Sequence, residues 1–276
     1  MLAMRGLATG LCAGCVVGLL RLSHDRAAAR VALWLEEWRE VWWTVPIWFG
    51  VLVALAVILR RIVREEPLIS GSGIPQTELA LAGRLSFTWW RVLLAKFLGS
   101  WLALFGGLAL GREGPSIQMG GAVGAGFHAL WRPAAPHALT GSPYVVAGAV
   151  AGLAAAFGAP AAGVLFAFEE MKSRRDTSLI VAACASAIGA HLMIRIVFGM
   201  GRILPFAGFE APPLSSFWIV ALEGAVFGVL GVGYNKTLLW LHDREAGQTL
   251  IPDRWRALPP LLLAGCLALF APLLIG

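Results

Sequence analysis

The sequence predicts an all-α membrane protein, and three observations lead to this prediction. Of the 276 residues, 58% are hydrophobic and only 14% are charged, with a mean hydropathy of +0.76. A soluble domain normally carries about 25% charged residues, so this chain has too few to cover a water-facing surface. Long apolar stretches alternate with short basic runs. Glycine and proline interrupt some of these stretches, which is typical of transporter helices that break inside a membrane.

The apolar stretches place the expected helices in order along the chain. The first lacks a small-residue cleavage site and runs into an arginine-containing segment, so we interpret it as a helix rather than a secretion signal. Several others are shorter than the roughly 20 residues that a full crossing requires. The expected helices cover approximately residues 2–31, 41–60, 90–110, 116–131, 144–157, 161–171, 178–199, 215–241 and 257–275.

Two of the helix boundaries are made by glycine and proline. They lie at residues 111–115 (GREGP) and at residues 158–160 (GAP). A broken helix leaves unpaired backbone groups, which a membrane tolerates only where they line a cavity or are buried in protein. The most polar loops between the expected helices lie at 132–143, 200–214 and 243–257.

The charge distribution indicates a membrane topology. Lys and Arg number 22 against 16 Asp and Glu, which gives a net charge of +6. In a soluble protein this excess would suggest a nucleic-acid partner. Here the cations form short runs between apolar segments, at 60–64 (RRIVR) and 172–175 (KSRR), as cytoplasmic loops do. We therefore expect the lipid bilayer and no nucleic acid as a partner, and one transmembrane domain over residues 1–276 without a soluble domain.

The cysteines give no indication of a metal site. Cys12 and Cys15 form a C-x-x-C pair, but there is no second pair and no histidine nearby. Cys184 and Cys266 also lie in apolar stretches, where cysteine is usually a small buried hydrophobe. We expect no metal, no cofactor and no enzymatic activity.

The first candidate site is the GSGIP stretch at residues 71–75. Its small residues let the backbone approach a ligand, and proline suits a first helical turn. Ser72 would offer a hydroxyl beside the free N–H groups at the start of a helical segment that begins near Gln76, an arrangement that suits an anion. The alternative is an ordinary Gly/Pro turn that joins two helices.

The second candidate site is the GREGP stretch, which places Glu113 between two glycines in apolar sequence. An ionisable residue inside a membrane is a functional hypothesis by default. We expect Pro115 to open a helix whose N–H groups and positive end face Glu113. An incoming anion would compete with this carboxylate, and protonation would release the side chain. The alternative is that Glu113 pairs with Arg112 in a loop.

The third candidate site is the acidic pair Glu169 and Glu170, which ends a short apolar helix just before a basic run. If that run is cytoplasmic, the pair lies at the inner face, where one carboxylate would accept protons. The alternative is that both side chains are interfacial partners of the nearby cations. Glu78 and Lys96 form a further candidate, as a structural pair between neighbouring segments.

Taken together, these motifs resemble the CLC family of chloride channels and chloride–proton antiporters. The family carries a GSGIP stretch followed some forty residues later by GREGP, and both occur here in that order. Residues 152–171 are similar to a third family segment that reads close to GLAAAFNAPLAGILF..EEM. The resemblance implies a bundle of tilted and broken transmembrane helices that comprises the first half and the start of the second inverted repeat.

The resemblance also implies roles for individual residues and partners. Glu113 resembles the gating glutamate, Glu170 the internal proton acceptor of the exchangers, and Ser72 the serine that coordinates the central anion. A serine there is similar to chloride-preferring members, so chloride and protons are the expected substrates. The resemblance further implies a homodimer, with helices around 161–199 in the interface, in a bacterial inner membrane. The implied anion-binding residues are Ser72, Gly73, Ile74, Arg112, Glu113 and Gly114.

The sequence departs from the family pattern in two respects. A further family motif close to GIFAP and an anion-contacting tyrosine do not occur, since Tyr144 and Tyr234 stand in other contexts. We therefore expect the natural protein to continue past Gly276, so that this chain is the N-terminal two-thirds of a family member. Gln76 also stands where the family usually has glutamate.

Three alternatives to proton-coupled chloride exchange remain at this point. The chain could be a passive chloride channel, which only proton flux distinguishes from an exchanger, or an inert fragment. The third alternative is an intramembrane CAAX-type protease, because Glu169, Glu170 and Arg174 fit an E-E-x-x-x-R pattern. Such proteases also need a Phe four residues before a His, and none of the five histidines has one.

Overall fold

A computed structural model describes residues 1–39, 41, 43–108, 110–169, 176–201, 213–247, 252 and 255–270. These residues form helices joined by turns and irregular segments, and no strand occurs among them. The chain divides into one unit that spans Met1–Ile203 and Ala257–Gly276 and a second that spans Leu204–Arg256. The first unit contains α1 (Leu2–Arg39), α2 (Thr44–Glu65), the short turn η1 (Pro67–Ile69), α3 (Ile74–Leu81), α4 (Trp89–Phe105), α5 (Glu113–Trp131), α6 (Pro143–Phe157), α7 (Pro160–Glu169), α8 (Thr177–Leu192), the π-helical turn η2 (Met193–Val197) and α10 (Leu258–Phe270).

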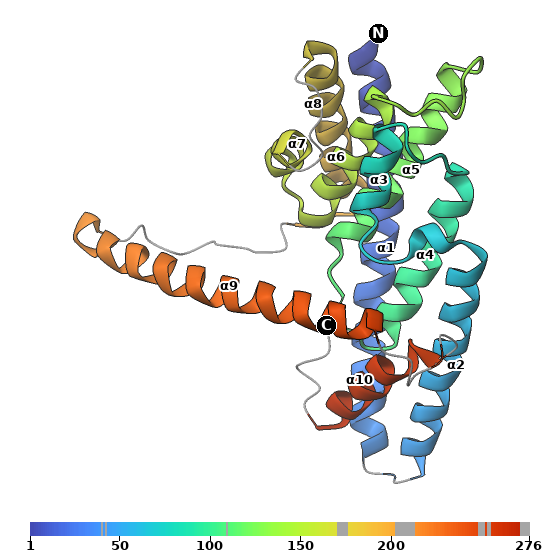
Figure 1. The fold of residues 1–276 in the computed structure, drawn as a ribbon, viewed down its shortest axis with the longest axis vertical. Coiled ribbons are helices and arrows are strands. Elements are labelled where there is room, and N and C mark those ends of the chain that lie inside the picture. Colours follow the sequence, from blue (N-terminus) through green and yellow to red (C-terminus); the bar gives the residue numbers. More distant parts are fainter. Residues whose placement is uncertain are drawn as a thin grey trace. The chain divides into compact units, whose positions relative to one another are not determined.

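Helix α1 runs along the first unit, with α6 and α8 beside its N-terminal half and α2 and α10 beside its C-terminal half (Figure 1). A glycine stripe brings α1 and α8 together. A Cβ added to Gly6 would lie 2.6 Å from the carbonyl oxygen of Ala182, and one added to Gly14 would lie 2.8 Å from the Cα of Ala190. Small residues at four-residue spacing therefore allow the two backbones to touch, as in other membrane helix pairs.

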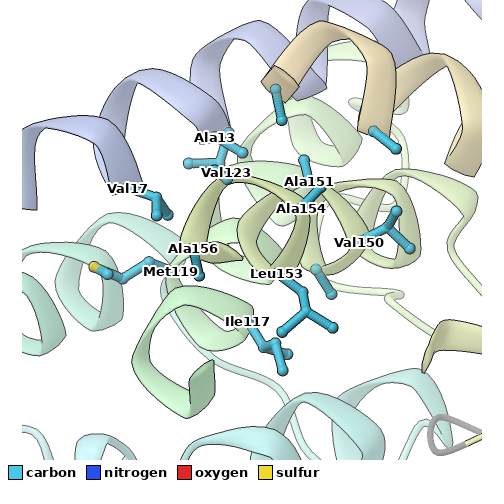
Figure 2. Close-up of a cluster of buried hydrophobic side chains, with 14 of the residues drawn as sticks. Ala13, Val17, Ile117, Met119, Val123, Val150, Ala151, Leu153, Ala154 and Ala156 are labelled. Carbon is cyan, nitrogen blue, oxygen red and sulfur yellow. The ribbon is translucent and has the colours of Figure 1, made fainter. Parts of the chain in front are cut away.

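Helices α5 and α6 cross at an equally short distance. A Cβ on Gly120 would overlap the Gly148 carbonyl, and a Cβ on Gly148 would overlap the Gly120 carbonyl. Apolar side chains from α1, α5 and α6 meet around this crossing (Figure 2), and Val17 and Ile117 are fully buried there. This core fixes the position at which α5 begins relative to α1.

A second apolar cluster joins α2 to α10. Trp48 and Leu52 of α2 pack with Leu261 of α10, and Leu52 and Leu261 are fully buried. Gly106 and Gly265 make this packing close, because a Cβ at either position would collide with a leucine side chain. Small residues therefore allow α2, α4 and α10 to pack closely in this part of the unit.

The helix boundaries agree with the prediction at the 158–160 break and differ from it at several other helix ends. Helix α1 continues to Arg39, eight residues beyond the predicted end at 31, and α2 continues to Glu65 instead of 60. These extensions carry charges but no glycine or proline, so hydropathy falls while helix propensity stays high. In contrast, α4 stops at Phe105 instead of 110, because Gly107 adopts a left-handed φ of 79°.

The second unit consists, among its described residues, of the turn η3 (Leu214–Ser216) followed by α9 (Phe217–Gly247). By length and composition, four helical segments could cross a membrane, namely Leu2–Val31, Thr44–Glu65, Thr177–Val197 and Leu214–Arg244. The shorter apolar helices Pro143–Phe157 and Pro160–Glu169 are separated by Gly158 in the left-handed region, as the break predicted at 158–160 requires.

Candidate functional site

The GSGIP stretch forms the start of α3. Gly71 and Gly73 adopt φ angles of 71° and 92°, which a residue with a side chain rarely adopts. Helix α3 then begins at Ile74, two residues earlier than predicted, with Pro75 in its first turn. The Ser72 hydroxyl accepts a hydrogen bond from the Ile74 N–H at 3.3 Å, so the serine lies at the N-terminus of this helix.

The backbone just before Ser72 is held by buried and partly buried side chains. Each carbonyl of residues 68–71 accepts a hydrogen bond from a side-chain donor, which compensates its partial negative charge. Gln118 Nε2 donates to the carbonyl of Leu68 (2.7 Å), Lys96 Nζ to those of Ile69 (2.8 Å) and Gly71 (2.7 Å), and Gln76 Nε2 to that of Ser70 (2.9 Å). The Gln76 amide thus has a task that an ionised glutamate at this position would be unable to perform, because a carboxylate has no N–H to donate.

Lys96 provides a buried positive charge behind this loop. Its side chain is 4% exposed, and a buried cation is tolerated when it is hydrogen-bonded. Both Glu78 and Lys96 are described, and no ion pair joins them. The predicted Glu78–Lys96 pair is therefore wrong, because the ammonium group is occupied by the two loop carbonyls instead.

Glu78 lines a cavity beside α3. The cavity has a volume of about 1010 Å³ and also contacts the segment before α6 and the start of α8. Arg84, Arg132 and Asp176 are among the other charged residues that line it. Pro75 of the GSGIP stretch lines this cavity, but none of the residues predicted to bind the anion does.

The GREGP stretch forms the start of α5. Helix α5 begins at Glu113, so the predicted opening of the helix at Pro115 is wrong by two residues. Proline fits within a first turn as well as at its first position, since the N–H groups there have no intrahelical acceptor. Glu113 therefore belongs to the helix start itself, and its carboxylate folds back over Gly111, where a Cβ would collide with it.

Arg112 pairs with a residue that the sequence did not indicate. Its guanidinium Nη2 lies 3.0 Å from Oδ1 of Asp25 on α1, and no ion pair between Arg112 and Glu113 occurs among the described residues. The alternative in which Glu113 merely pairs with Arg112 is therefore not what the structure contains. The Glu113 side chain is exposed, and Arg112 anchors the loop to α1.

The two stretches touch each other directly. A Cβ on Gly114 would lie 2.5 Å from the Ser72 carbonyl oxygen and 2.8 Å from the Ser72 Cβ. A Cβ on Gly73 would in turn collide with the side chain of Gln118 on α5. Ser72 and Gly73, which precede α3, thus lie against Gly114 and Gln118 of α5, although some forty residues separate the two motifs in sequence. The N-termini of two helices meet at this point.

The acidic pair that ends α7 lies only partly in the described region. Glu169 is the last residue of α7 and is exposed. Glu170, the predicted internal proton acceptor, lies outside the described residues, as does the basic run after it. Its role therefore stays a prediction.

Several residues of the site escaped the sequence analysis. Gln118 is 3% exposed and ties α5 to the loop before α3, while Arg21, His24 and Asp25 lie on α1 beside the GREGP stretch. The signal for the α1 residues was available, since charged side chains at i, i+3 and i+4 inside an apolar span are functional candidates.

Comparisons with known proteins agree on one family. A family model described as voltage gated chloride channel matches residues 49–276. The H(+)/Cl(-) exchange transporter ClcA of Vibrio cholerae serotype O1 is 37% identical over 241 residues, which cover 84% of this chain and 51% of that protein. The chain thus spans about half the length of the curated relatives it matches.

Solved structures agree on the fold. The crystal structure of a slow cyanobacterial Cl−/H+ antiporter matches with a TM-score of 0.80 and 28% identity, over 96% of this chain and 63% of the other. A CLC-type fluoride/proton antiporter matches with a TM-score of 0.71 and 21% identity, over 98% of this chain and 65% of the other, and indicates the fold alone. The predicted fold class, an all-α bundle of tilted and broken membrane helices, is confirmed by these structures.

Proposed function

Because the chain belongs to the voltage-gated chloride channel family, which includes membrane transporters, we propose that the protein exchanges chloride for protons. It is an integral membrane protein with several apolar helices. We propose that it resides in a bacterial inner membrane and acts as a transporter, with no enzymatic activity. A homodimer with helices around 161–199 in the interface is part of the same proposal.

The observation that carries the proposal is the contact between Ser72 and Gly114. It brings together the N-termini of α3 and α5, whose first N–H groups have no intrahelical acceptor. Each helix contributes a partial positive charge at this end, and an anion between the two ends would be attracted by both. The buried ammonium of Lys96 adds a full positive charge behind the Ser72 loop.

Glu113 is the proposed gate. Its carboxylate lies in the first turn of α5, where an anionic group is favoured, and competes with chloride for the same positive end. Protonation neutralises the carboxylate, which then leaves the position to the anion. Ser72 contributes its hydroxyl, and backbone groups of Gly73, Ile74, Arg112 and Gly114 complete the cradle.

Glu170 is the proposed acceptor of protons from the inner side of the membrane. Its place directly after α7 and before a basic run supports this role. The acceptor favours an exchanger over a passive channel, since a channel has no use for a second proton-binding carboxylate. The relatives named above are themselves described as exchangers.

The proposal is tested by substitution of the gate. Proteoliposomes that contain the protein at its natural full length are monitored with chloride and pH electrodes during chloride efflux. Glu113→Ala is expected to conduct chloride without proton movement, because no carboxylate remains to carry the proton. Glu65→Gln serves as a control, since Glu65 ends α2 and makes only an exposed ion pair with Arg61. Proton movement by Glu113→Ala equal to that of the control would contradict the gate assignment.

A further inference from the structure

Three polar side chains lie on one face of α1, inside a segment long and apolar enough to cross a membrane. Arg21, His24 and Asp25 are spaced i, i+3 and i+4, which places them side by side on a helix. Arg21 is 5% exposed and His24 is 2% exposed. Ionisable groups are energetically costly to place in a membrane span, so their presence there indicates a structural or functional role.

Arg21 binds the end of α6. Its Nη1 donates to the carbonyl oxygen of Ala155 at 2.7 Å, across 134 residues of sequence. Helix α6 ends at Phe157, and the N–H groups of Gly158 and Ala159 both bond to Ala154. The Ala155 carbonyl is therefore satisfied by Arg21, whose positive charge suits the negative end of a helix. Through this bond α1 holds the α6–α7 break.

Asp25 binds the start of α5. Its Oδ1 lies 3.0 Å from Nη2 of Arg112, the residue that precedes Glu113. The Arg112 carbonyl accepts the N–H of Ser116 at 3.1 Å and so forms part of the first turn of α5. The side chain of Arg112 and the first turn of the helix are consequently fixed by the same carboxylate.

The Asp25 carboxylate also interacts electrostatically with the other ionisable side chains around it. Electrostatic interactions link it to Arg21 and to His24, and link both of these to Arg112. One carboxylate thus lies among two guanidinium groups and a buried imidazole. Its removal would leave Arg21 and Arg112 as like charges without an anion between them, which pushes Arg112 away from α1.

We propose that Asp25 is a positioning residue for the Glu113 gate, and that α1 acts through Arg21 and Asp25 as a clamp on the two helix breaks at 111–112 and 158–159. The clamp keeps the first turn of α5 in the register at which Gly114 meets Ser72. This inference rests on the proposed function, because the gating role of Glu113 is part of that proposal. The clamp itself is a property of the ion pair and can be measured without transport.

The clamp is tested by amide hydrogen exchange on the purified protein, with the peptide that covers residues 111–116 as the readout. Asp25→Asn is expected to raise exchange there about fivefold, as the loss of a partly exposed ion pair should. Asp25→Glu keeps a carboxylate and is expected to stay close to wild type. The matched control is Glu65→Gln, which removes the exposed Arg61–Glu65 pair in α2. Equal exchange in Asp25→Asn and in the control would overturn the proposal.

Two further measurements keep the test decisive. If Asp25→Asn does not yield folded protein, Arg112→Gln breaks the same pair from the other side and must raise exchange equally, or the proposal fails. In proteoliposomes, Asp25→Asn is expected to move fewer protons per chloride than Asp25→Glu. Wild-type coupling in a variant with a loosened 111–116 segment would show that the pair is structural only. Absence of coupling in the wild type, with the exchange difference intact, would contradict the proposed function and leave the clamp supported.

Discussion

Replacement of Gly114 by alanine tests the contact on which the candidate site depends. The new Cβ would lie 2.5 Å from the Ser72 carbonyl oxygen, whereas ordinary contact begins at 3.4 Å. The Ser72 backbone therefore has to retreat by 3.4 − 2.5, or about 0.9 Å. Overpacking of this kind costs about 1–3 kcal/mol, and the better helix propensity of alanine returns up to about 1 kcal/mol. We expect a net loss of about 1–2 kcal/mol in the free energy of unfolding.

The effect on the anion follows from the same displacement. If Ser72 hydrogen-bonds chloride, its retreat removes an interaction with a charged partner worth about 1.5–3 kcal/mol, which corresponds to at least about a tenfold loss of affinity. Chloride binding is measured by isothermal titration calorimetry, and stability by the thermal change in tryptophan fluorescence. Gly99→Ala is the matched control, because its Cβ would meet only Ile69 Cδ1 at an ordinary 3.5 Å. Equal chloride affinity in the two variants would show that the contact between Ser72 and Gly114 does not position a ligand of the anion.

Two other substitutions test the framework of the site. Gly148→Ala places a Cβ into the Gly120 carbonyl at the α5–α6 crossing, and is expected to cost about 3 kcal/mol of stability in thermal unfolding. Gly50→Ala in α2, whose Cβ would meet no atom within 4 Å, is the control and should be neutral or slightly stabilising, because alanine has the better helix propensity. Similar unfolding midpoints for these two would contradict the crossing. Lys96→Met leaves two loop carbonyls without their hydrogen-bond donor, at a cost of about 1–3 kcal/mol each, so the midpoint of thermal unfolding should fall. The same substitution removes the positive charge behind the site, so the chloride affinity should fall as well. Wild-type affinity in that variant would exclude Lys96 as a source of the positive potential.

The helix breaks were predictable because their causes are local. Glycine at a left-handed φ and proline at a helix start are requirements of single residues, and both occur in the GSGIP and GAP stretches. The boundaries of α6 agree with the prediction to within one residue for this reason. In GREGP neither glycine has a left-handed φ and the helix begins before Pro115, so that boundary was predicted less closely. The predicted end of the first helix at 31 was wrong, because hydropathy reports where a helix leaves the apolar region rather than where it ends.

The partners of the polar side chains were not predictable from one sequence. Lys96 was expected to meet Glu78, yet its ammonium group donates to two backbone carbonyls that have no signature in the sequence. The Asp25–Arg112 pair joins residues 87 positions apart, and its formation depends on the glycine contacts that hold α1 against its neighbours. Hydrophobic periodicity gives the faces of helices, but distances between them depend on the packing of the whole bundle.

Uphill proton movement is the most direct test of chloride–proton exchange. Liposomes that contain the protein at its natural full length, loaded with high chloride and diluted into low chloride at equal pH, are followed with a pH electrode while a potassium ionophore clamps the membrane potential. We predict that chloride leaving the vesicles drives protons inward against their developing gradient, and that Glu113→Ala abolishes this movement. Chloride efflux in the wild type without any change in pH would contradict it.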